Sequence, residues 1–160
     1  MHLIKTDLRQ FSAAHRLVKG YLGKCSHLHG HDYRVNLTIG ATALNDLDLV
    51  VDFDDIKTLC DGWVQGHLDH GTLISESDTT LYDFVKEHKQ KHYVLPNNRN
   101  ATAEALAEHL FQVFNELWAT NSDKLNPTSF IHTVEVWESD KSGAMYCKDG
   151  SLSRGEPCGV

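Results

Sequence analysis

Two stretches of alternating apolar and polar residues constrain most strongly what this chain can fold into. In residues 31–40, HDYRVNLTIG, every second side chain from Tyr33 to Ile39 is apolar, and residues 130–138, FIHTVEVWE, alternate in the same way. Alternation with a period of two is typical of a strand that buries one face and exposes the other. Both stretches are therefore predicted to be strands of a sheet with one covered face.

Two helices are predicted between these strands. Apolar side chains recur at helical spacing in residues 56–67, ending before the turn residues of GHLDHG, and again in residues 103–117. Asn100 or Thr102 is suited to cap the second helix, because short polar side chains accept a hydrogen bond from the first free backbone N–H groups. Each helix has one apolar stripe and is expected to pack against the sheet.

The complete order of elements then predicts the fold class. Residues 2–15 are expected to form a first strand and residues 144–149 a short last strand, which gives the order β-β-α-α-β-β. This order predicts an α+β fold, in which an antiparallel four-stranded sheet carries two helices on one face. Residues 1–150 are expected to form a single domain. Residues 75–99 read as an insertion between the helices with a short helix of its own, and residues 151–160 as a loose tail.

Composition excludes several classes of function. The 160 residues include 41% hydrophobic and 23% charged residues, as in ordinary globular proteins, and the formal net charge is −7. An acidic balance argues against a nucleic-acid binder or a protein bound to an anionic membrane surface. There is no apolar run of 18 residues and no signal-peptide pattern, so a cytoplasmic location is expected. The four cysteines are irregularly spaced and are expected to be reduced.

The most unusual local feature is the heptapeptide CSHLHGH. It contains four of the chain's metal-capable side chains at every second position: Cys25, His27, His29 and His31. On a strand, such residues point to the same side, so two histidines could grip one metal ion. His15, at the end of the preceding strand, is the natural third ligand. The residues alone leave open which histidines bind, and whether Cys25 is a fourth ligand or a free thiol.

The donor type indicates the metal. Three imidazoles with an open fourth position are typical of catalytic zinc, whereas the same set closed by Cys25 would be a structural zinc site. Nickel, cobalt or iron could replace zinc at such a site.

Two further groups carry reactive side chains. In the LDHG stretch, Asp69 could orient His70 or another proton carrier if the chain turns there. Glu138 has the same parity as Val134 and Val136 and so belongs to the expected buried face. A carboxylate there needs hydrogen-bond donors, and a ligand ring with two N–H groups could supply them.

Taken in order, these motifs resemble a known family. FSAAH, C-x3-HGH, VDF, LDH, T-x-E and VEVWE occur in the sequence as they do in the 6-pyruvoyl-tetrahydropterin synthase and 6-carboxy-tetrahydropterin synthase family, over roughly residues 3–148. The resemblance implies the tunnelling fold, and trimers that stack into homohexamers with active sites at subunit interfaces. It implies a pterin triphosphate as the small-molecule substrate.

The resemblance also implies roles for single residues. His15, His29 and His31 match the zinc ligands, and Cys25 matches the catalytic cysteine. Asp69 and His70 match the pair that works with this cysteine from a neighbouring subunit. Pterin-contacting positions are matched by Glu138, which would anchor the ring, and by Thr102 and Glu104. His27 is a candidate phosphate contact, as are Arg16, Lys24 and Arg34.

The spacing of the cysteine bears on the product. Three residues separate Cys25 from His29, as in the family members that form the 6-carboxy product. The expected reaction is therefore the zinc-dependent conversion of 7,8-dihydroneopterin triphosphate to 6-carboxy-5,6,7,8-tetrahydropterin, with release of triphosphate and acetaldehyde, on the route to queuosine. One alternative is 6-pyruvoyl-tetrahydropterin synthase, on the biopterin route. Another is a non-enzymatic zinc-binding oligomer.

Overall fold

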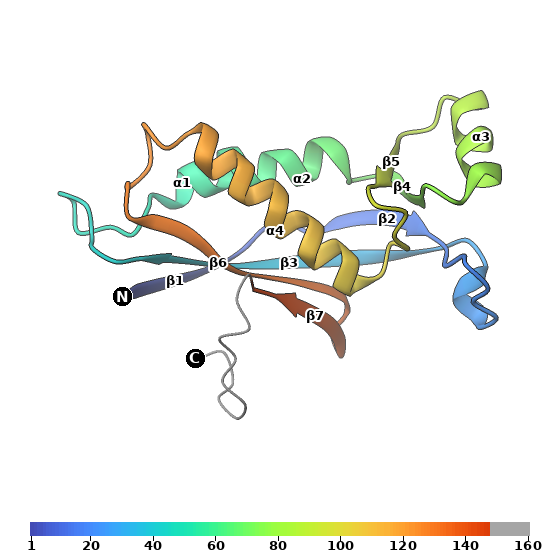
Figure 1. Cartoon of the computed structure of the whole chain (residues 1–160), viewed down its shortest axis with the longest axis horizontal. Coiled ribbons are helices and arrows are strands. Elements are labelled where there is room, and N and C mark those ends of the chain that lie inside the picture. Colours follow the sequence, from blue (N-terminus) through green and yellow to red (C-terminus); the bar gives the residue numbers. More distant parts are fainter. Residues whose placement is uncertain (148–160) are drawn as a thin grey trace.

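A computed structural model of the protein describes residues 1–147 and shows a mixed sheet with helices on one face (Figure 1). The described strands pair in the order β5-β4-β2-β3-β6-β7, and β1 pairs with β3 beside β2. The strands are β1 (His2–Asp7), β2 (Phe11–His15), β3 (His29–Ala41), β4 (Gly71–Ser75), β5 (His92–Leu95), β6 (Ser129–Ser139) and β7 (Ser142–Tyr146).

The helices gather mainly above this sheet. A continuous helical segment consists of α1 (Phe53–Ile56), the π-helical η2 (Lys57–Asp61) and α2 (Gly62–His67). It lies beside the long helix α4 (Ala103–Thr120), and both cover the same face, whereas α3 (Thr79–Glu87) stands apart beyond one end (Figure 1). A short 3-10 helix, η1 (Lys24–Ser26), interrupts the loop before β3. None of the helices in residues 1–147 is long and apolar enough to cross a membrane.

The α+β class is confirmed, but the prediction of an antiparallel four-stranded sheet with two helices was wrong. Residues 71–95, which include most of the predicted insertion, add β4 and β5 to the sheet, and both pair in parallel. They also contain α3 as a third helix. The insertion thus extends the sheet. The expected tail at 151–160 and the last residues of the predicted domain lie outside the described residues.

The predicted first strand is divided into two by one extra residue. Asp7 of β1 pairs with Asn36, and Phe11 of β2 pairs with Tyr33. The chain thus advances four residues from Asp7 to Phe11 while β3 advances only three. This change of register moves the buried face from even to odd positions and brings Phe11 and His15 onto the helix-covered side. It explains why the stretch does not show one continuous alternation.

The core lies between the sheet and the helices. It is formed by Tyr33, Val35, Leu37 and Ile39 of β3, together with the apolar faces of β6 and α4. Thr102 caps α4, as predicted, and its side chain accepts a hydrogen bond from the Ala105 amide at 3.3 Å. Packing along most of β3 leaves its first residues, His29 and His31, at the edge of the core.

Candidate metal centre and active-site pocket

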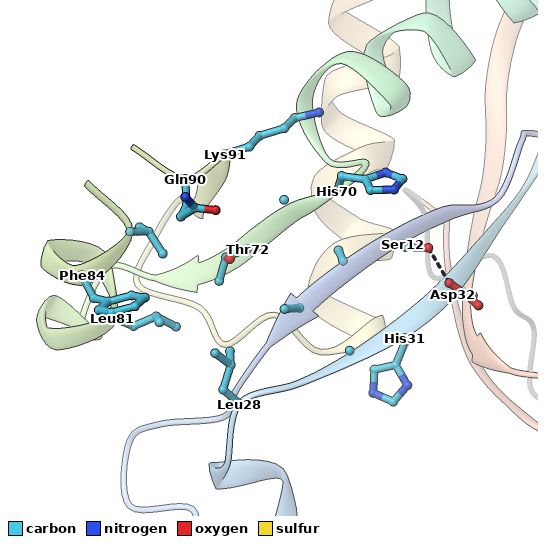
Figure 2. A pocket seen from close by; sticks show the side chains of 15 residues that line it. Ser12, Leu28, His31, Asp32, His70, Thr72, Leu81, Phe84, Gln90 and Lys91 are labelled. Carbon is cyan, nitrogen blue, oxygen red and sulfur yellow. Dashed lines mark hydrogen bonds between the residues drawn. The ribbon is translucent and has the colours of Figure 1, made fainter. Parts of the chain in front are cut away.

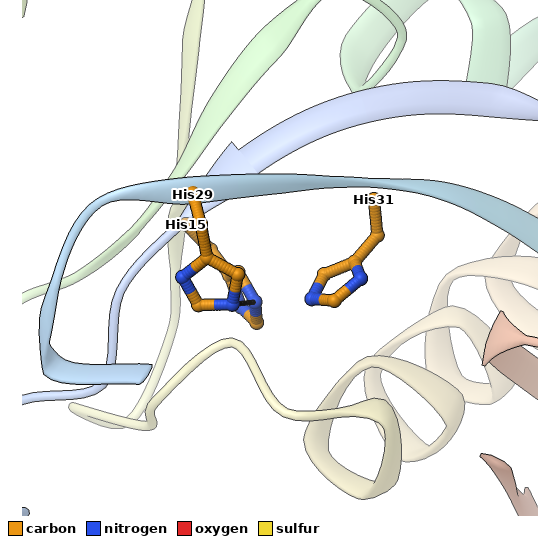
Figure 3. Close-up of side chains that lie close together, drawn as sticks. All are labelled: His15, His29 and His31. Carbon is orange, nitrogen blue, oxygen red and sulfur yellow. Dashed lines mark hydrogen bonds between the residues drawn. The ribbon is translucent and has the colours of Figure 1, made fainter. Parts of the chain in front are cut away.

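Three histidines converge where β2 ends and β3 begins (Figure 3). Antiparallel pairing sets His15 opposite His29, and His31 follows on the same face of β3. The ring centroids lie 4.6 to 5.1 Å apart, and the potential ligand nitrogens all lie within 4.8 Å of one another. The predicted set of His15, His29 and His31 is therefore brought together by strand pairing.

Backbone carbonyl groups fix the orientation of two of these rings. Nδ1 of His15 lies 2.6 Å from the carbonyl oxygen of Ala101, and Nδ1 of His29 lies 2.7 Å from that of His27. If each Nδ1–H donates to its carbonyl, each Nε2 keeps a lone pair, and these two Nε2 atoms are 3.2 Å apart. A histidine held in this way by its second nitrogen is typical of metal sites.

The protonation state of His15 also fits a metal ligand. Its side chain is only 2% exposed. Its pKa is lowered to about 4, mainly by burial and to a smaller extent by His29 and His31, against the opposing effect of the Ala101 hydrogen bond. The ring is therefore neutral at pH 7, as metal binding requires. Three imidazole donors with no carboxylate among them fit a zinc ion.

His27 does not belong to the cluster. Its side chain is exposed, and its described contribution is the carbonyl group that orients His29. Cys25, in η1, lies outside the three-donor group as well, although its half-buried side chain lines a pocket together with the three histidines. The structure thus separates the cysteine from the histidine donors.

A pocket of about 250 Å³ opens beside the histidine cluster. It collects side chains from five separate segments of the chain: His15, Leu17, Cys25, His29, His31, Thr102, Ala103, Glu104, Glu138, Ser142 and Gly143. The positions predicted to contact a pterin ring are thus found in one cavity with the histidines and the cysteine. Leu17 and the β6–β7 hairpin residues were not predicted, because nothing in their local sequence indicates a ligand.

Glu138 lies on the predicted face of β6. The β3–β6 register pairs Arg34 with Trp137, so the next pair sets Tyr33 beside Glu138. Burial raises the pKa of the Tyr33 hydroxyl, and the negative charge of Glu138 raises it further. Glu138, which lines the pocket, is therefore close enough to the buried Tyr33 hydroxyl to raise its pKa.

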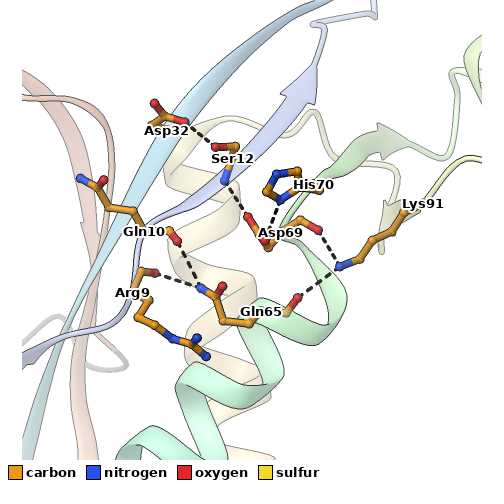
Figure 4. A network of polar contacts seen from close by, with 8 residues as sticks. All are labelled: Arg9, Gln10, Ser12, Asp32, Gln65, Asp69, His70 and Lys91. Carbon is orange, nitrogen blue, oxygen red and sulfur yellow. Dashed lines mark hydrogen bonds and ion pairs between the residues drawn. The ribbon is translucent and has the colours of Figure 1, made fainter.

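Asp69 and His70 form the expected pair, but not in this pocket. His70 has a positive φ of 56°, and this turn lets two adjacent side chains meet, with Nδ1 of His70 2.7 Å from Oδ2 of Asp69 (Figure 4). The Ser12 amide donates to Oδ1 of Asp69 at 3.0 Å. Burial acts to raise the pKa of Asp69, but the hydrogen bonds from His70 and the Ser12 amide, together with the charge of Lys91, lower it. The His70 ring is mostly exposed.

His70 faces a second, larger groove of about 520 Å³ (Figure 2). This groove lies between β2, β3, β4 and α3, and its lining is partly apolar, with Leu28, Leu81 and Phe84. Ser12 and Asp32 are hydrogen-bonded to each other in its wall at 2.5 Å. Within one chain, His70 and Cys25 therefore line different cavities.

Two of the predicted phosphate contacts are already engaged. Arg16 donates two hydrogen bonds to the buried Asp78, at 2.5 and 2.6 Å. Arg34 lies 3.3 Å from the Asp140 carboxylate and above the Trp137 ring. Arg16 is thus not free to bind a phosphate without breaking an ion pair.

The chain is similar to known proteins over most of its length. The family model described as 6-pyruvoyl tetrahydropterin synthase matches residues 4–149. The chain is 41% identical over 139 residues to a Rickettsia bellii protein named 6-carboxy-5,6,7,8-tetrahydropterin synthase, covering 85% of this chain and 94% of the relative. An Aquifex aeolicus protein of the same name is 29% identical over 154 residues, covering 86% and 93%.

Solved structures show the same fold at low sequence identity. An uncharacterised protein from Wolinella succinogenes has a TM-score of 0.75 at 18% identity, covering 92% of this chain and 98% of that one. The 6-pyruvoyl tetrahydropterin synthase of Plasmodium falciparum has a TM-score of 0.65 at 19% identity, covering 92% and 97%. The chain therefore belongs to the 6-pyruvoyl tetrahydropterin synthase family, and its relatives assign it to the 6-carboxy-5,6,7,8-tetrahydropterin synthase branch.

Proposed function

We propose that this protein is a zinc-dependent lyase that converts 7,8-dihydroneopterin triphosphate to 6-carboxy-5,6,7,8-tetrahydropterin. Triphosphate and acetaldehyde would be released, and the product would serve 7-deazaguanine (queuosine) biosynthesis. The observation that carries the proposal is the single cavity lined by the three histidines, Cys25 and Glu138. The names of the curated relatives support the carboxy product.

His15, His29 and His31 would hold the zinc ion. When bound there, zinc supplies a Lewis acid for the oxygen atoms of the substrate side chain. The carbonyl groups of Ala101 and His27 keep the imidazoles of His15 and His29 in the tautomer that leaves Nε2 free.

Cys25 would remove a proton from the side chain of the substrate as a thiolate. Its backbone is held in place because the Leu17 amide donates to the Cys25 carbonyl oxygen at 2.8 Å. The separation of Cys25 from the three-donor group supports a free thiol and argues against the alternative of a structural site closed by cysteine.

Asp69 and His70 would return or relay protons from a neighbouring subunit. Asp69 fixes Nδ1 of His70, so Nε2 is the nitrogen available for proton transfer. The exposed His70 ring does not line the pocket of its own chain that contains Cys25, so it would act in the pocket of a neighbouring subunit. We propose the homohexamer, a dimer of trimers, as the assembly in which this occurs.

Glu138 would accept two N–H groups of the pterin ring, and Thr102 and Glu104 would contact the ring from the start of α4. The exposed His27 would contact the triphosphate. The substrate would thus lie with its ring towards β6 and its phosphates towards the loop before β3.

The product decides between this proposal and its alternatives. Zinc-loaded protein is incubated with 7,8-dihydroneopterin triphosphate, and the pterin products and trapped acetaldehyde are measured by mass spectrometry. A 6-carboxy pterin with equimolar acetaldehyde is expected. A 6-pyruvoyl product without acetaldehyde would favour 6-pyruvoyl-tetrahydropterin synthase. No product from fully zinc-loaded protein would contradict both and favour a non-enzymatic zinc-binding oligomer.

A further inference from the structure

Tyr33 carries a buried hydroxyl group with no hydrogen-bond partner among the described residues. The side chain is 0% exposed. Its ring stacks on Phe11 at a centroid distance of 5.0 Å and meets His31 edge-on at 5.5 Å. Phenylalanine would make the same ring contacts, so packing does not explain the hydroxyl. A buried donor without an acceptor destabilises the folded protein, and its presence at this position requires another reason.

Glu138 is the acceptor that strand pairing offers to this hydroxyl. The register pairs Val35 with Val136 and Arg34 with Trp137, which makes Tyr33 and Glu138 the next cross-strand neighbours, on the same face as the two buried valines. The register shifts between Trp137 and Ser139, so Glu138 lies at an irregular position of β6. Glu138 is only half-buried and lines the pocket, where its long side chain has room to rotate.

We infer that Tyr33 is a positioning residue for the pterin ring, whose hydroxyl donates a hydrogen bond to the Glu138 carboxylate when the ring is bound. One carboxylate oxygen would accept from Tyr33, and the carboxylate would thereby be held in the orientation that receives the ring N–H groups. An ionised carboxylate accepts several hydrogen bonds at once, so the two roles are compatible. The inference rests on the proposed function, because it assumes that Glu138 binds a pterin.

The test is a double-mutant cycle of Tyr33→Phe and Glu138→Ala, with Tyr93→Phe as a matched control. Binding of 7,8-dihydroneopterin is measured by calorimetry, the melting temperature by thermal unfolding, and KM and kcat with the triphosphate substrate. Zinc content is measured for every variant. The Tyr93 hydroxyl is outside the pocket and has a partner, His109, at 2.7 Å.

The expected results separate a positioning role from a structural one. Tyr33→Phe should weaken 7,8-dihydroneopterin binding about tenfold and raise KM by a similar factor, with kcat changed by less than about twofold. In the Glu138→Ala background, Tyr33→Phe should change binding by less than about twofold, because the effect acts through the Glu138 side chain. The melting temperature of the free protein should stay equal or rise, because an unpaired buried donor is removed. Tyr93→Phe should lower the melting temperature and leave binding unchanged.

Two results would overturn the inference. Equal binding by the wild type and Tyr33→Phe would show that the hydroxyl has no role in the site. An equal loss of binding with and without the Glu138 carboxylate would show that Tyr33 does not act through it. Failure of the wild type to bind 7,8-dihydroneopterin or to form product would instead contradict the proposed function, and the inference with it.

Discussion

Burial distinguishes Cys25 from Cys60 in the folded protein. Cys60 is completely buried in η2, and burial raises the pKa of its thiol to about 12, with a further contribution from the Asp61 charge. Cys25 is half-buried and lines the pocket of the histidine cluster. Thiolate character and access together decide reactivity, so only one of these two thiols has a setting suited to chemistry.

Iodoacetamide at pH 8 is therefore expected to modify Cys25 in the folded protein much faster than Cys60. Peptide mapping by mass spectrometry measures the modified fraction of each cysteine over time. Unfolding the protein in urea should make the two rates similar, which serves as the control. Equal rates in the folded protein would contradict the assignment of Cys60 as an inert core residue.

His15 predicts how the metal-free protein responds to pH. Its pKa is about 4 in the folded protein and near the ordinary value of 6.5 after unfolding. The unfolded state thus binds more protons between these values, so folding free energy is lost as the pH falls from about 6.5 towards 4, by about 2–3 kcal/mol from this residue. Urea unfolding after chelation, at pH 7 and pH 4.5, measures this loss.

The variant His15→Gln should lose less stability than the wild type over the same pH range. His2→Gln is the matched control, because that side chain is exposed and its replacement should leave the pH dependence unchanged. Identical pH dependence in His15→Gln and wild type would show that His15 does not titrate with folding.

The types of the proposed ligand side chains were predictable from the sequence, but the backbone groups that orient them were not. Period-two spacing indicated that His29 and His31 share a face, and strand pairing supplied His15. The carbonyl group that orients His15 belongs to Ala101, 86 residues away, and the residues between carry no pattern that places it there. The tautomer of a ligand histidine depends on such distant contacts.

Helix α3 stands apart from the other helices, but the residue that caps it also holds the loop that carries Cys25. Asp78 caps this helix by accepting from the Leu81 amide, and the same carboxylate binds Arg16. Arg16 follows His15 and begins the loop that carries Cys25. Asn100 holds the same loop, because its side chain accepts from the Val18 amide at 3.0 Å. Asp78, in the stretch from β4 to β5, and Asn100, after β5, thus both support the cysteine loop.

Asp78→Asn should destabilise the protein by about 2–3 kcal/mol and reduce turnover. The Asp78 carboxylate is buried, and without its charge Arg16, which is itself partly buried, loses its counter-ion. Arg16, and to a smaller extent the Leu81 amide, lower the pKa of Asp78 against the effect of burial. Its stabilising contribution is therefore present above the ordinary carboxyl pKa and is lost as the pH falls below it.

Urea unfolding and turnover by the variant check this prediction. Asp54→Asn is the matched control, because the Asp54–Lys57 pair is exposed on both sides and its loss should not measurably change stability. Full turnover in Asp78→Asn would contradict the supporting role of the stretch from β4 to β5.

Long, strongly periodic elements were predictable, whereas the short parallel strands were not. The stretches predicted at 31–40, 130–138 and 102–118 correspond to β3, β6 and α4. β4 and β5 have only five and four residues, and their parallel pairing joins residues across α3. Such pairing depends on the tertiary structure, so local alternation gave no sign of it.

At the scale of the whole molecule, the two parts of the proposed active site lie in different cavities of one chain. Cys25 lines the pocket of the histidine cluster, and His70 lines the larger groove. If a neighbouring subunit supplies His70, an oligomer that mixes two defective subunits contains some complete sites.

Cys25→Ala and His70→Ala should each be nearly inactive alone, and mixed oligomers should regain activity, up to about a quarter of the wild type for random pairing across a two-subunit site. Unfolding and refolding the two variants together produces the mixture, and product formation measures it. Each variant refolded alone is the control. Mixtures that remain inactive, with zinc and oligomeric state intact, would contradict the shared site.

Strand β3 contributes residues to both cavities. The wall between the two cavities is a single layer of backbone there, and His31 lines both of them. A neighbouring subunit that occupied the groove would therefore contact His31, one of the proposed metal ligands. By thermodynamic reciprocity, any free energy by which assembly strengthens metal binding is also the free energy by which the metal strengthens assembly. Metal content and subunit association in this protein should then rise and fall together.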